Sequence, residues 1–192
     1  MSSSLETGTP SRSTAPIRGR AIEPFDVLDA CHQQIAQAVD QLQVLVEHLQ
    51  NEGADGKAQA LARDIFQFFM NTARQHHLDE EKHIFPALLA SGDDELIQHT
   101  LRLQQDHGWI EEDWLELAPQ IEAIAAGYSW YNIDQLAQAI PMFAALYADH
   151  MALEESLIYP EAKARIATWD LYGMGREMAE RRRVPEAATK AA

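Results

Sequence analysis

A pattern of metal-ligand residues occurs twice in this sequence. In each copy a histidine stands four residues before a glutamate doublet, and an aromatic residue followed by proline comes next. The first copy is His76, Glu80-Glu81 and Phe85-Pro86, and the second is His150, Glu154-Glu155 and Tyr159-Pro160. Helical residues four apart lie on one face, so each copy presents an imidazole and a carboxylate together, as a metal site requires. The repetition predicts a duplicated unit that holds a ligand between helices.

The duplication extends beyond the two motifs. One further histidine lies upstream of each copy, His32 in the first half and His107 in the second. Each half therefore reads as a helical hairpin, with a histidine on its first helix and a histidine plus a glutamate on its second. Together the halves offer four imidazoles and two carboxylates, from His32, His76, Glu80, His107, His150 and Glu154.

The composition indicates one globular domain. The chain has 192 residues, 46% of them hydrophobic, which is enough to bury a core without stabilising cross-links such as disulfides. Its net charge of -15 argues against nucleic acid or a membrane as a partner, because both attract basic surfaces. The lone Cys31 excludes an intramolecular disulfide, and neither a membrane-length apolar run nor a secretory signal is visible. We therefore expect a cytoplasmic protein.

Apolar periodicity predicts four long helices. They are expected over approximately 24–50, 57–90, 94–126 and 132–160. Residues 1–22 are rich in Ser, Thr, Pro and Gly and are expected to be a disordered tail. Residues 161–192 are expected to form an extension, with a short helix and then a solvated, disordered tail that includes Arg181-Arg182-Arg183. Short connections between long helices predict an all-α, antiparallel up-down four-helix bundle over residues 23–160.

Helical geometry divides the motif residues into an inner and an outer set. At about 100° per residue, His76 and Glu80 lie on the apolar stripe of their helix, whereas His77 and Glu81 lie roughly 100° further round. In the second copy the histidine and the first glutamate lie inside, and Glu155 lies outside. We therefore expect His77, Glu81 and Glu155 to face solvent.

The four histidines are expected at one depth in the bundle. His32 and His76 lie at nearly equal sequence distances from Gly53. His76 and His107 do so around Gly92, and His107 and His150 do so around Ser129. The mismatches amount to about 1.5–3 Å of helical rise. All four imidazoles should therefore meet at one level and face inward.

A buried polar layer of this kind needs compensation, because each unpaired group costs several kcal/mol. A metal cluster supplies that compensation, and imidazole and carboxylate without thiolate favour iron or manganese over zinc. Six ligands suit two ions bridged by Glu80 and Glu154, and a bridging oxo or hydroxo group leaves one open position on each ion. The competing interpretation is two polar layers that hydrogen bonds and water satisfy.

This array resembles the hemerythrin-like, HHE cation-binding family over roughly residues 24–160. The resemblance rests on the two motifs with their aromatic-proline pairs, together with His32 and His107, in order on four helices. It implies a hemerythrin-like bundle with a non-haem di-iron site (Fe2+/Fe3+), in which the four histidines are terminal ligands and the two glutamates bridge. The family's roles include reversible dioxygen binding, oxygen or redox sensing, and iron handling.

The sequence also departs from oxygen-carrying hemerythrins. Their third helix carries two ligating histidines one turn apart, whereas Leu103 and Glu111 occupy the positions one turn from His107. The departure argues against simple oxygen carriage and leaves an extra site for water, peroxide or Glu111.

Two further residues are candidates for an additional ligand or a hydrogen-bond partner of a ligand. Glu80-x-x-His83 resembles the motif of ferritin-like di-metal bundles, and the alternative for His83 is a packed or surface histidine. Tyr147 lies one turn before His150 and is either a hydrogen-bond donor to the site or a core residue.

Three functional hypotheses follow. The first is a di-iron protein that binds dioxygen or a related small oxidant for oxygen or redox sensing, storage or detoxification. The second is a di-iron enzyme with peroxidase-, catalase- or nitric-oxide-reductase-like activity, or an iron-handling protein. The third is a structural bundle whose acidic face binds a protein partner. Signalling, in the first case, would also pass through a protein partner.

Overall fold

The structure is a computed structural model that describes residues 23–182, apart from the side chains of residues 168 and 169. All regular structure within that range is helical, which confirms the predicted all-α class. The predicted tail over residues 1–22 lies outside the described residues, as do residues 183–192 of the predicted C-terminal tail. No described helix is both long enough and apolar enough to cross a membrane.

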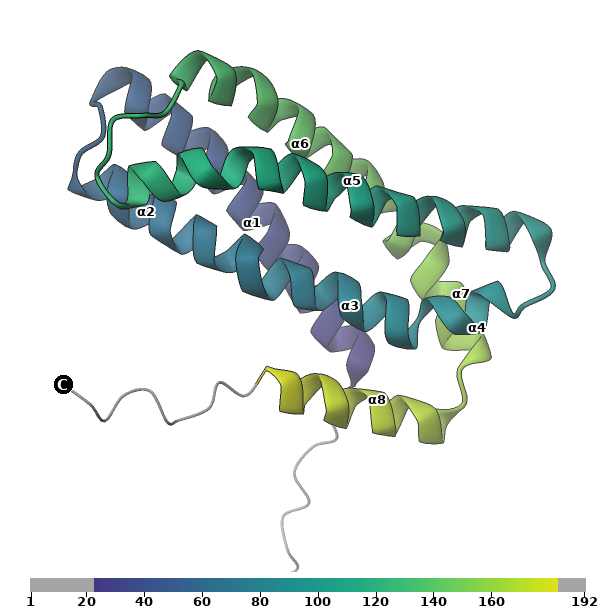
Figure 1. Ribbon diagram of the computed structural model, residues 1–192. Coiled ribbons are helices and arrows are strands. Elements are labelled where there is room, and N and C mark those ends of the chain that lie inside the picture. The colour runs from purple at the N-terminus through teal and green to yellow at the C-terminus, as the bar shows by residue number, and fades with distance from the viewer. Residues whose placement is uncertain (1–22, 183–192) are drawn as a thin grey trace, which may run out of the picture.

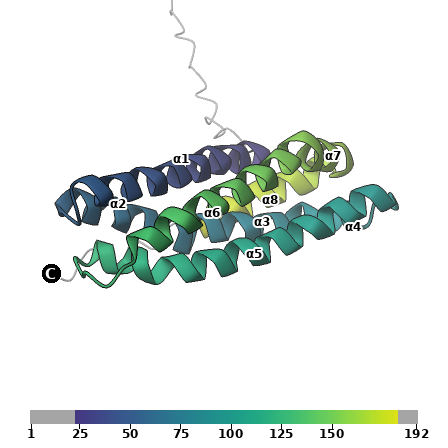
Figure 2. The same ribbon diagram turned by 90° about the horizontal axis from the view of Figure 1, so that it is seen from above.

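Four antiparallel rods form the bundle, as predicted (Figures 1 and 2). The first rod is α1 (Pro24–Asn51), and the third is α5 (Asp94–Ala125). The second rod comprises α2 (Gly56–Gln67), the π-helical segment η1 (Phe68–Ala73), α3 (Arg74–His83) and α4 (Phe85–Leu89). The fourth comprises α6 (Ile133–Leu153), the π-helical segment η2 (Glu154–Ile158) and α7 (Tyr159–Arg165).

Short capped turns connect the rods. Asp55, Asp93 and Asn132 each precede a helix, and their side-chain oxygens accept hydrogen bonds from backbone N–H groups of its first turn. Gly53 and Gly127 follow the ends of α1 and α5 with φ angles of 82° and 77°, which L side chains rarely adopt. Connections this short place successive helices side by side and antiparallel.

The apolar core consists of two clusters, and the polar motif residues lie between them. On α1, His32 falls between Leu28 of the smaller cluster and Ile35 of the larger one. The same order holds on α5, where apolar residues of the two clusters flank His107. The polar layer is therefore covered by apolar side chains on both sides along the bundle axis.

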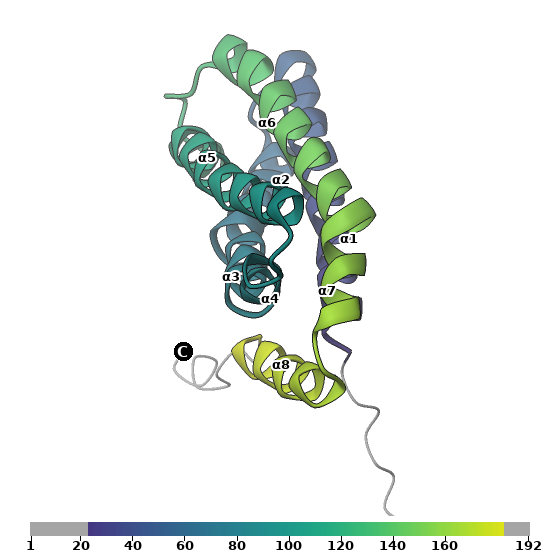
Figure 3. The ribbon, with the colours of Figure 1, turned by 90° about the vertical axis from the view of Figure 1, so that its right-hand side faces the viewer.

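The C-terminal helix α8 (Thr168–Arg181) lies across the bundle beneath α1 and α3 (Figure 3). Met174 and Met178 are buried in the smaller apolar cluster. Beyond them, Arg181 Nη2 lies 2.6 Å from Asp79 Oδ1 and Arg182 Nη1 lies 2.7 Å from Asp79 Oδ2. The expectation that Arg181 and Arg182 belong to a solvated tail is wrong, because both hold the fully buried carboxylate of Asp79.

Candidate metal centre

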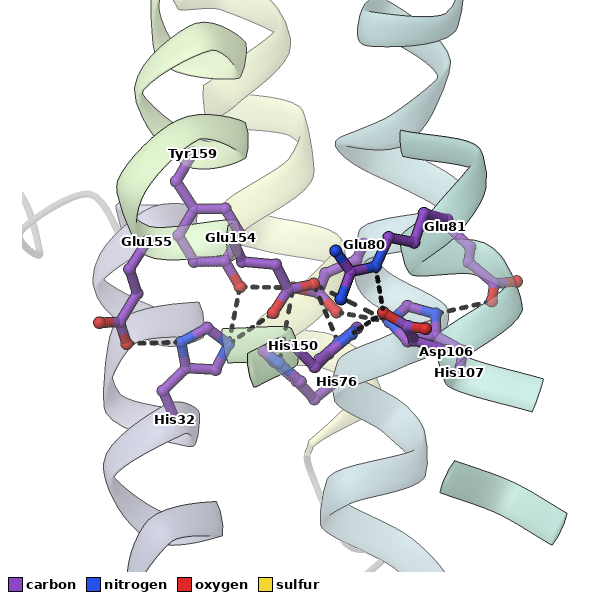
Figure 4. A network of polar contacts seen from close by, with 11 residues as sticks. His32, His76, Glu80, Glu81, Asp106, His107, His150, Glu154, Glu155 and Tyr159 are labelled. Carbon is purple, nitrogen blue, oxygen red and sulfur yellow. Dashed lines mark hydrogen bonds and ion pairs between the residues drawn. The ribbon is translucent and has the colours of Figure 1, made fainter. Parts of the chain in front are cut away.

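Six side chains from all four rods meet at one place inside the bundle (Figure 4). They are the histidines and glutamates that form the predicted ligand set, and each is at most 4% exposed. In chain order they are His32 of α1, His76 and Glu80 of α3, His107 of α5, His150 of α6 and Glu154 at the start of η2.

Each of the two carboxylates lies between imidazoles of different rods. Glu80 Oε1 lies 3.5 Å from His76 Nε2, and Glu80 Oε2 lies 3.4 Å from His107 Nε2. Glu154 makes the corresponding contacts with the other two imidazoles, at 3.2 Å each. A carboxylate that faces one imidazole with each oxygen is placed to bridge two ions.

The donor atoms form two overlapping groups, each with its atoms within 4.8 Å of one another. Both groups contain Glu80 and Glu154, and each adds two histidines from different rods. The groups are His32, His76, Glu80 and Glu154, and Glu80, His107, His150 and Glu154. Adjacent donor sets that share both carboxylates match the arrangement of di-metal carboxylate sites in helical bundles.

These buried donors lack hydrogen-bond partners of their own. Both ring nitrogens of His76 and His150, both oxygens of Glu154, Glu80 Oε2 and His107 Nε2 are buried without a protein hydrogen bond among the described residues. Buried polar atoms are normally satisfied, and each unsatisfied one costs about 1–3 kcal/mol. Imidazole nitrogen and carboxylate oxygen are donors that iron and manganese accept, so the residues present fit a metal pair.

Without metal, the ionisable side chains of the layer have pKa values shifted in opposite directions. Burial disfavours the charged form of His150, but Glu154 outweighs it and raises the pKa of His150 to about 10. Burial and neighbouring His32 instead hold the pKa of His76 well below its ordinary value. Burial and Glu154 raise the pKa of Glu80 to about 7. Burial opposes the ionisation of Glu154 as well, but His150 and His32 lower its pKa well below the ordinary range.

The second glutamate of each motif orients a histidine of the other half. His107 Nδ1 lies 2.9 Å from Glu81 Oε1, and His32 Nδ1 lies 2.9 Å from Glu155 Oε1. A carboxylate that accepts the Nδ1–H of an imidazole fixes the ring and leaves Nε2 as the free donor. Glu81 and Glu155 are 40% and 57% exposed, so they lie on the outer side as expected. The helical pattern of the sequence does not predict this orienting role, although the glutamate doublet is its signal.

Replacement of Glu81 or Glu155 by glutamine is therefore expected to weaken metal binding by roughly 10- to 100-fold without loss of fold. Each carboxylate orients a ligand histidine but is not itself a ligand. Competition with a chelator measures the apparent affinity of each variant. Glu112→Gln, an exposed change on α5, is the matched control. An affinity equal to that of the control would contradict the orienting role.

The aromatic residue of each motif also crosses to the other half. Phe85 stacks on His107 with ring centroids 5.4 Å apart, and Tyr159 stacks on His32 at 5.3 Å. The Tyr159 hydroxyl donates a hydrogen bond to Glu80 Oε1 and lies 3.1 Å from His32 Nε2. Burial and the nearby carboxylates raise the pKa of Tyr159 well above its ordinary value, so this hydroxyl keeps its proton. The aromatic-proline pair is visible in the sequence, but its spacing alone predicts no role for Tyr159.

The expectation that His77 faces solvent is wrong. His77 is 8% exposed, and its ring stacks on His107 with centroids 4.1 Å apart. The cause is η1, because a π-helical turn contains an extra residue and shifts the register of everything after it. The buried stripe therefore passes from Phe69 to Ala73 and then includes both His76 and His77.

Two of the additional candidates lie away from the donor groups. His83 Nε2 accepts a hydrogen bond from Arg181 Nη2 at 2.9 Å, which places His83 at the contact between α3 and α8. Glu111 is 52% exposed, and its Oε1 lies 3.3 Å from Arg74 Nη2. Neither residue belongs to a donor group.

A pocket of about 260 Å³ reaches the centre from between the second rod and α5. The buried residues His77, His107 and Tyr147 line it, together with the exposed Arg74 and Glu111, so the pocket connects the surface to the polar layer. Tyr147 is 1% exposed, and no hydrogen bond joins its hydroxyl to a described ligand candidate. The geometry places Tyr147 in the pocket wall and in the larger apolar cluster.

Two comparisons with known proteins cover this region. Residues 23–162 match the family model described as "Hemerythrin HHE cation binding domain". A protein of Haemophilus influenzae with the name "Uncharacterized protein" is 31% identical over 168 residues, which span 85% of this chain and 92% of that protein. The residues that match the family model include all six members of the two donor groups.

Proposed function

Because the chain belongs to the hemerythrin HHE cation-binding domain family, we propose that it is a non-haem di-iron protein that binds dioxygen or a related small oxidant. The observation that carries the proposal is the pair of donor groups that share Glu80 and Glu154. In this proposal the four histidines would be terminal ligands, the two carboxylates would bridge the ions, and an oxo or hydroxo group would complete the bridge. Manganese is the second choice of metal. The role is sensing, storage or detoxification. The proposed compartment is the cytoplasm, because the single, buried Cys31 suits a reducing environment.

An iron pair would supply a redox-active centre with open coordination positions. The protein's own residues hold and shield that centre. The apolar clusters exclude water on both sides, while Glu81 and Glu155 keep two imidazoles directed inward. The Tyr159 hydroxyl, held between Glu80 and His32, is a hydrogen-bond donor inside the layer.

A di-iron enzyme is the second candidate, and two observations favour it. Peroxidase-, catalase- or nitric-oxide-reductase-like turnover needs a path for the substrate and a source of protons. The pocket beside His77 and His107 offers the path. Tyr159 offers a protonated hydroxyl inside the layer, between Glu80 and His32.

The test begins with protein purified with iron. We expect about two ions per chain and the charge-transfer absorption of a coupled ferric pair. Addition of hydrogen peroxide or nitric oxide then separates the candidates, because a sensor or carrier gives one binding event and an enzyme gives many turnovers. Fewer than two metals per chain without those bands would refute the di-iron proposal and leave the structural bundle as the better explanation.

The affinity of the chain for a divalent metal is expected to rise with pH. The neighbouring carboxylates overcome burial and raise the pKa values of His32, His107 and His150, so these imidazoles hold protons that metal must displace. Each proton displaced changes the apparent association constant by about tenfold per pH unit. The rise should continue above pH 7, because the pKa of His150 is about 10. Titration with manganese between pH 6 and 9 measures it, and a flat profile would contradict the protonated layer.

A further inference from the structure

The pocket between the second rod and α5 is larger than a small oxidant needs. Its volume is about 260 Å³, whereas an apolar cavity of about 150 Å³ already holds a benzene molecule. Its lining includes the exposed apolar side chains of Met70, Leu78 and Leu115, which lie toward the solvent. A diatomic molecule requires neither this volume nor an apolar rim, so the pocket fits an organic molecule with a single ring.

Gly108 leaves part of this volume unfilled. It lies inside the long helix α5 and lines the pocket, although a glycine inside a helix costs about 1 kcal/mol relative to alanine. A Cβ atom added to Gly108 would meet no packed neighbour within 4 Å, and the backbone there has no positive φ. Neither a close helix contact nor the backbone therefore requires glycine at this position. What the missing side chain provides is space in the pocket.

Three aromatic side chains form the inner wall of the pocket. Phe69, Trp114 and Tyr147 line it, and each is at most 5% exposed. The ring centroid of Phe69 lies 4.6 Å from that of Trp114 and 5.9 Å from that of Tyr147. Aromatic rings add favourably to one another in offset or edge-to-face contacts. The wall therefore favours a ligand that itself contains an aromatic ring.

His77 adds an unpartnered polar side chain to the same lining. It is 8% exposed, and its Nε2 is buried without a hydrogen-bond partner among the described residues. Its ring stacks on that of His107, with centroids 4.1 Å apart and planes 14° apart. The lone pairs of two nearly parallel imidazoles cannot converge on one ion, so metal binding does not explain this side chain. A buried polar atom without a partner costs about 1–3 kcal/mol, and a ligand hydroxyl would offset that cost.

The charged side chains of the lining are already paired. Arg74 Nη2 lies 3.3 Å from Glu111 Oε1, and Glu81 Oε1 lies 2.9 Å from His107 Nδ1. Among the described residues that line the pocket, no guanidinium or carboxylate remains without an ionic or hydrogen-bonding partner. An anion would also be repelled by the two glutamates. The pocket therefore favours a neutral ligand over an ion.

We propose that this pocket is a binding site for a small, neutral aromatic alcohol of the phenol class. Its ring packs against Phe69 and Trp114, and its hydroxyl forms a hydrogen bond with His77. The site goes beyond the proposed function, because it lies beside the six candidate metal ligands and its ligand is not the oxidant. Binding requires no metal, so the two proposals can be tested separately.

Calorimetric titration of the full chain with para-cresol tests the site. We expect one molecule to bind per chain, with similar affinity in the metal-free and the manganese-loaded protein. Toluene lacks the hydroxyl, and para-toluate is an anion of similar shape, so each should bind at least tenfold more weakly. Equal affinity for toluene or para-toluate would overturn the proposed ligand class. Binding of para-cresol to the manganese-loaded form alone would indicate coordination by the ion and overturn the site.

Two glycine variants provide a matched test of the location. Gly108→Leu places a side chain in the pocket, and we expect it to weaken para-cresol binding at least tenfold. Gly173→Leu is the control, because Gly173 lies in α8, outside the pocket lining, and a Cβ there also meets no packed neighbour within 4 Å. Leucine favours a helix more than glycine does, so neither change should unfold the protein. Circular dichroism verifies this.

A third variant tests the polar contact. His77→Phe keeps a ring in the wall and removes its nitrogens, so the affinity for para-cresol should fall to that for toluene. Unchanged para-cresol binding in Gly108→Leu or in His77→Phe, or no saturable binding by the wild type, would overturn the inference. Iron content is measured independently. A chain with two irons and no para-cresol site contradicts this inference alone, whereas a chain with the site and fewer than two irons contradicts only the di-iron proposal.

Discussion

Glu154→Ala is expected to abolish binding of the metal pair, so that iron content falls from about two ions per chain to less than one. Glu154 is fully buried, and its two oxygens face His32 and His150 on different rods at 3.2 Å each. It therefore belongs to both donor groups, and its loss removes a ligand from each ion at once. Iron analysis and the charge-transfer spectrum of the purified variant measure the loss.

The neighbouring glutamate provides the matched control. Glu155 lies one residue away and, among the described residues, pairs with the outer nitrogen of His32, so Glu155→Ala should retain both ions at reduced affinity. Glu154→Gln keeps the volume of the side chain and shows whether an empty space, and not a missing charge, causes the defect. Circular dichroism establishes that each variant is helical. A Glu154→Ala protein that still bound two irons would exclude a bridging role for this carboxylate.

The double variant Arg181→Ala/Arg182→Ala is expected to lose about 3 kcal/mol of stability, because it leaves a buried carboxylate without its counterions. Asp79 is fully buried, and the two guanidinium groups are its ion-pair partners at 2.6 and 2.7 Å. Removal of one partner from a buried pair costs about 3–5 kcal/mol, and undocking of α8, which lets water reach Asp79, keeps the loss near the lower end. For a domain of this size the melting temperature should fall by roughly 6–12 °C.

Limited proteolysis distinguishes local from global loss in this variant. If α8 undocks, cleavage between α7 and α8 should accelerate while the four rods stay protected. Arg176→Ala, an exposed change on the same helix, is the control for charge and helix propensity. Asp79→Asn added to the double variant should recover part of the stability, since it removes the uncompensated charge. A melting temperature equal to that of Arg176→Ala would show that Asp79 does not need the two arginines.

Much of the fold follows from the sequence because helical periodicity is local. The spacing of the motif histidines and first glutamates placed them on inner faces, and the positions of the turns placed the histidines at similar depths. The structure brings these six side chains together within the bundle. Their service as metal ligands remains a prediction that the proposed experiments address.

Other features of the site depend on a helix irregularity and on contacts between distant parts of the chain, which a uniform helical wheel cannot represent. One extra residue in the π-helical turn η1 turned His77 from the predicted outer face into the core. The roles of Glu81 and Tyr159 depend on contacts with the other half of the chain, and such contacts require the three-dimensional packing of the rods. Arg181 looked like part of a basic tail because its partner, Asp79, is about a hundred residues away in sequence.

The exchange of orienting groups between the halves has a consequence for how such a protein can arise. His32 is held by Glu155 and stacked by Tyr159, while His107 is held by Glu81 and stacked by Phe85. A single hairpin of this kind would have to associate with an identical copy to complete its polar layer, and symmetry would then force both halves of that layer to be alike. Fusion of two hairpin genes into one removes that constraint. Only in one fused chain can the two halves differ, as they do where Tyr159 supplies a hydroxyl to the layer and Phe85 does not.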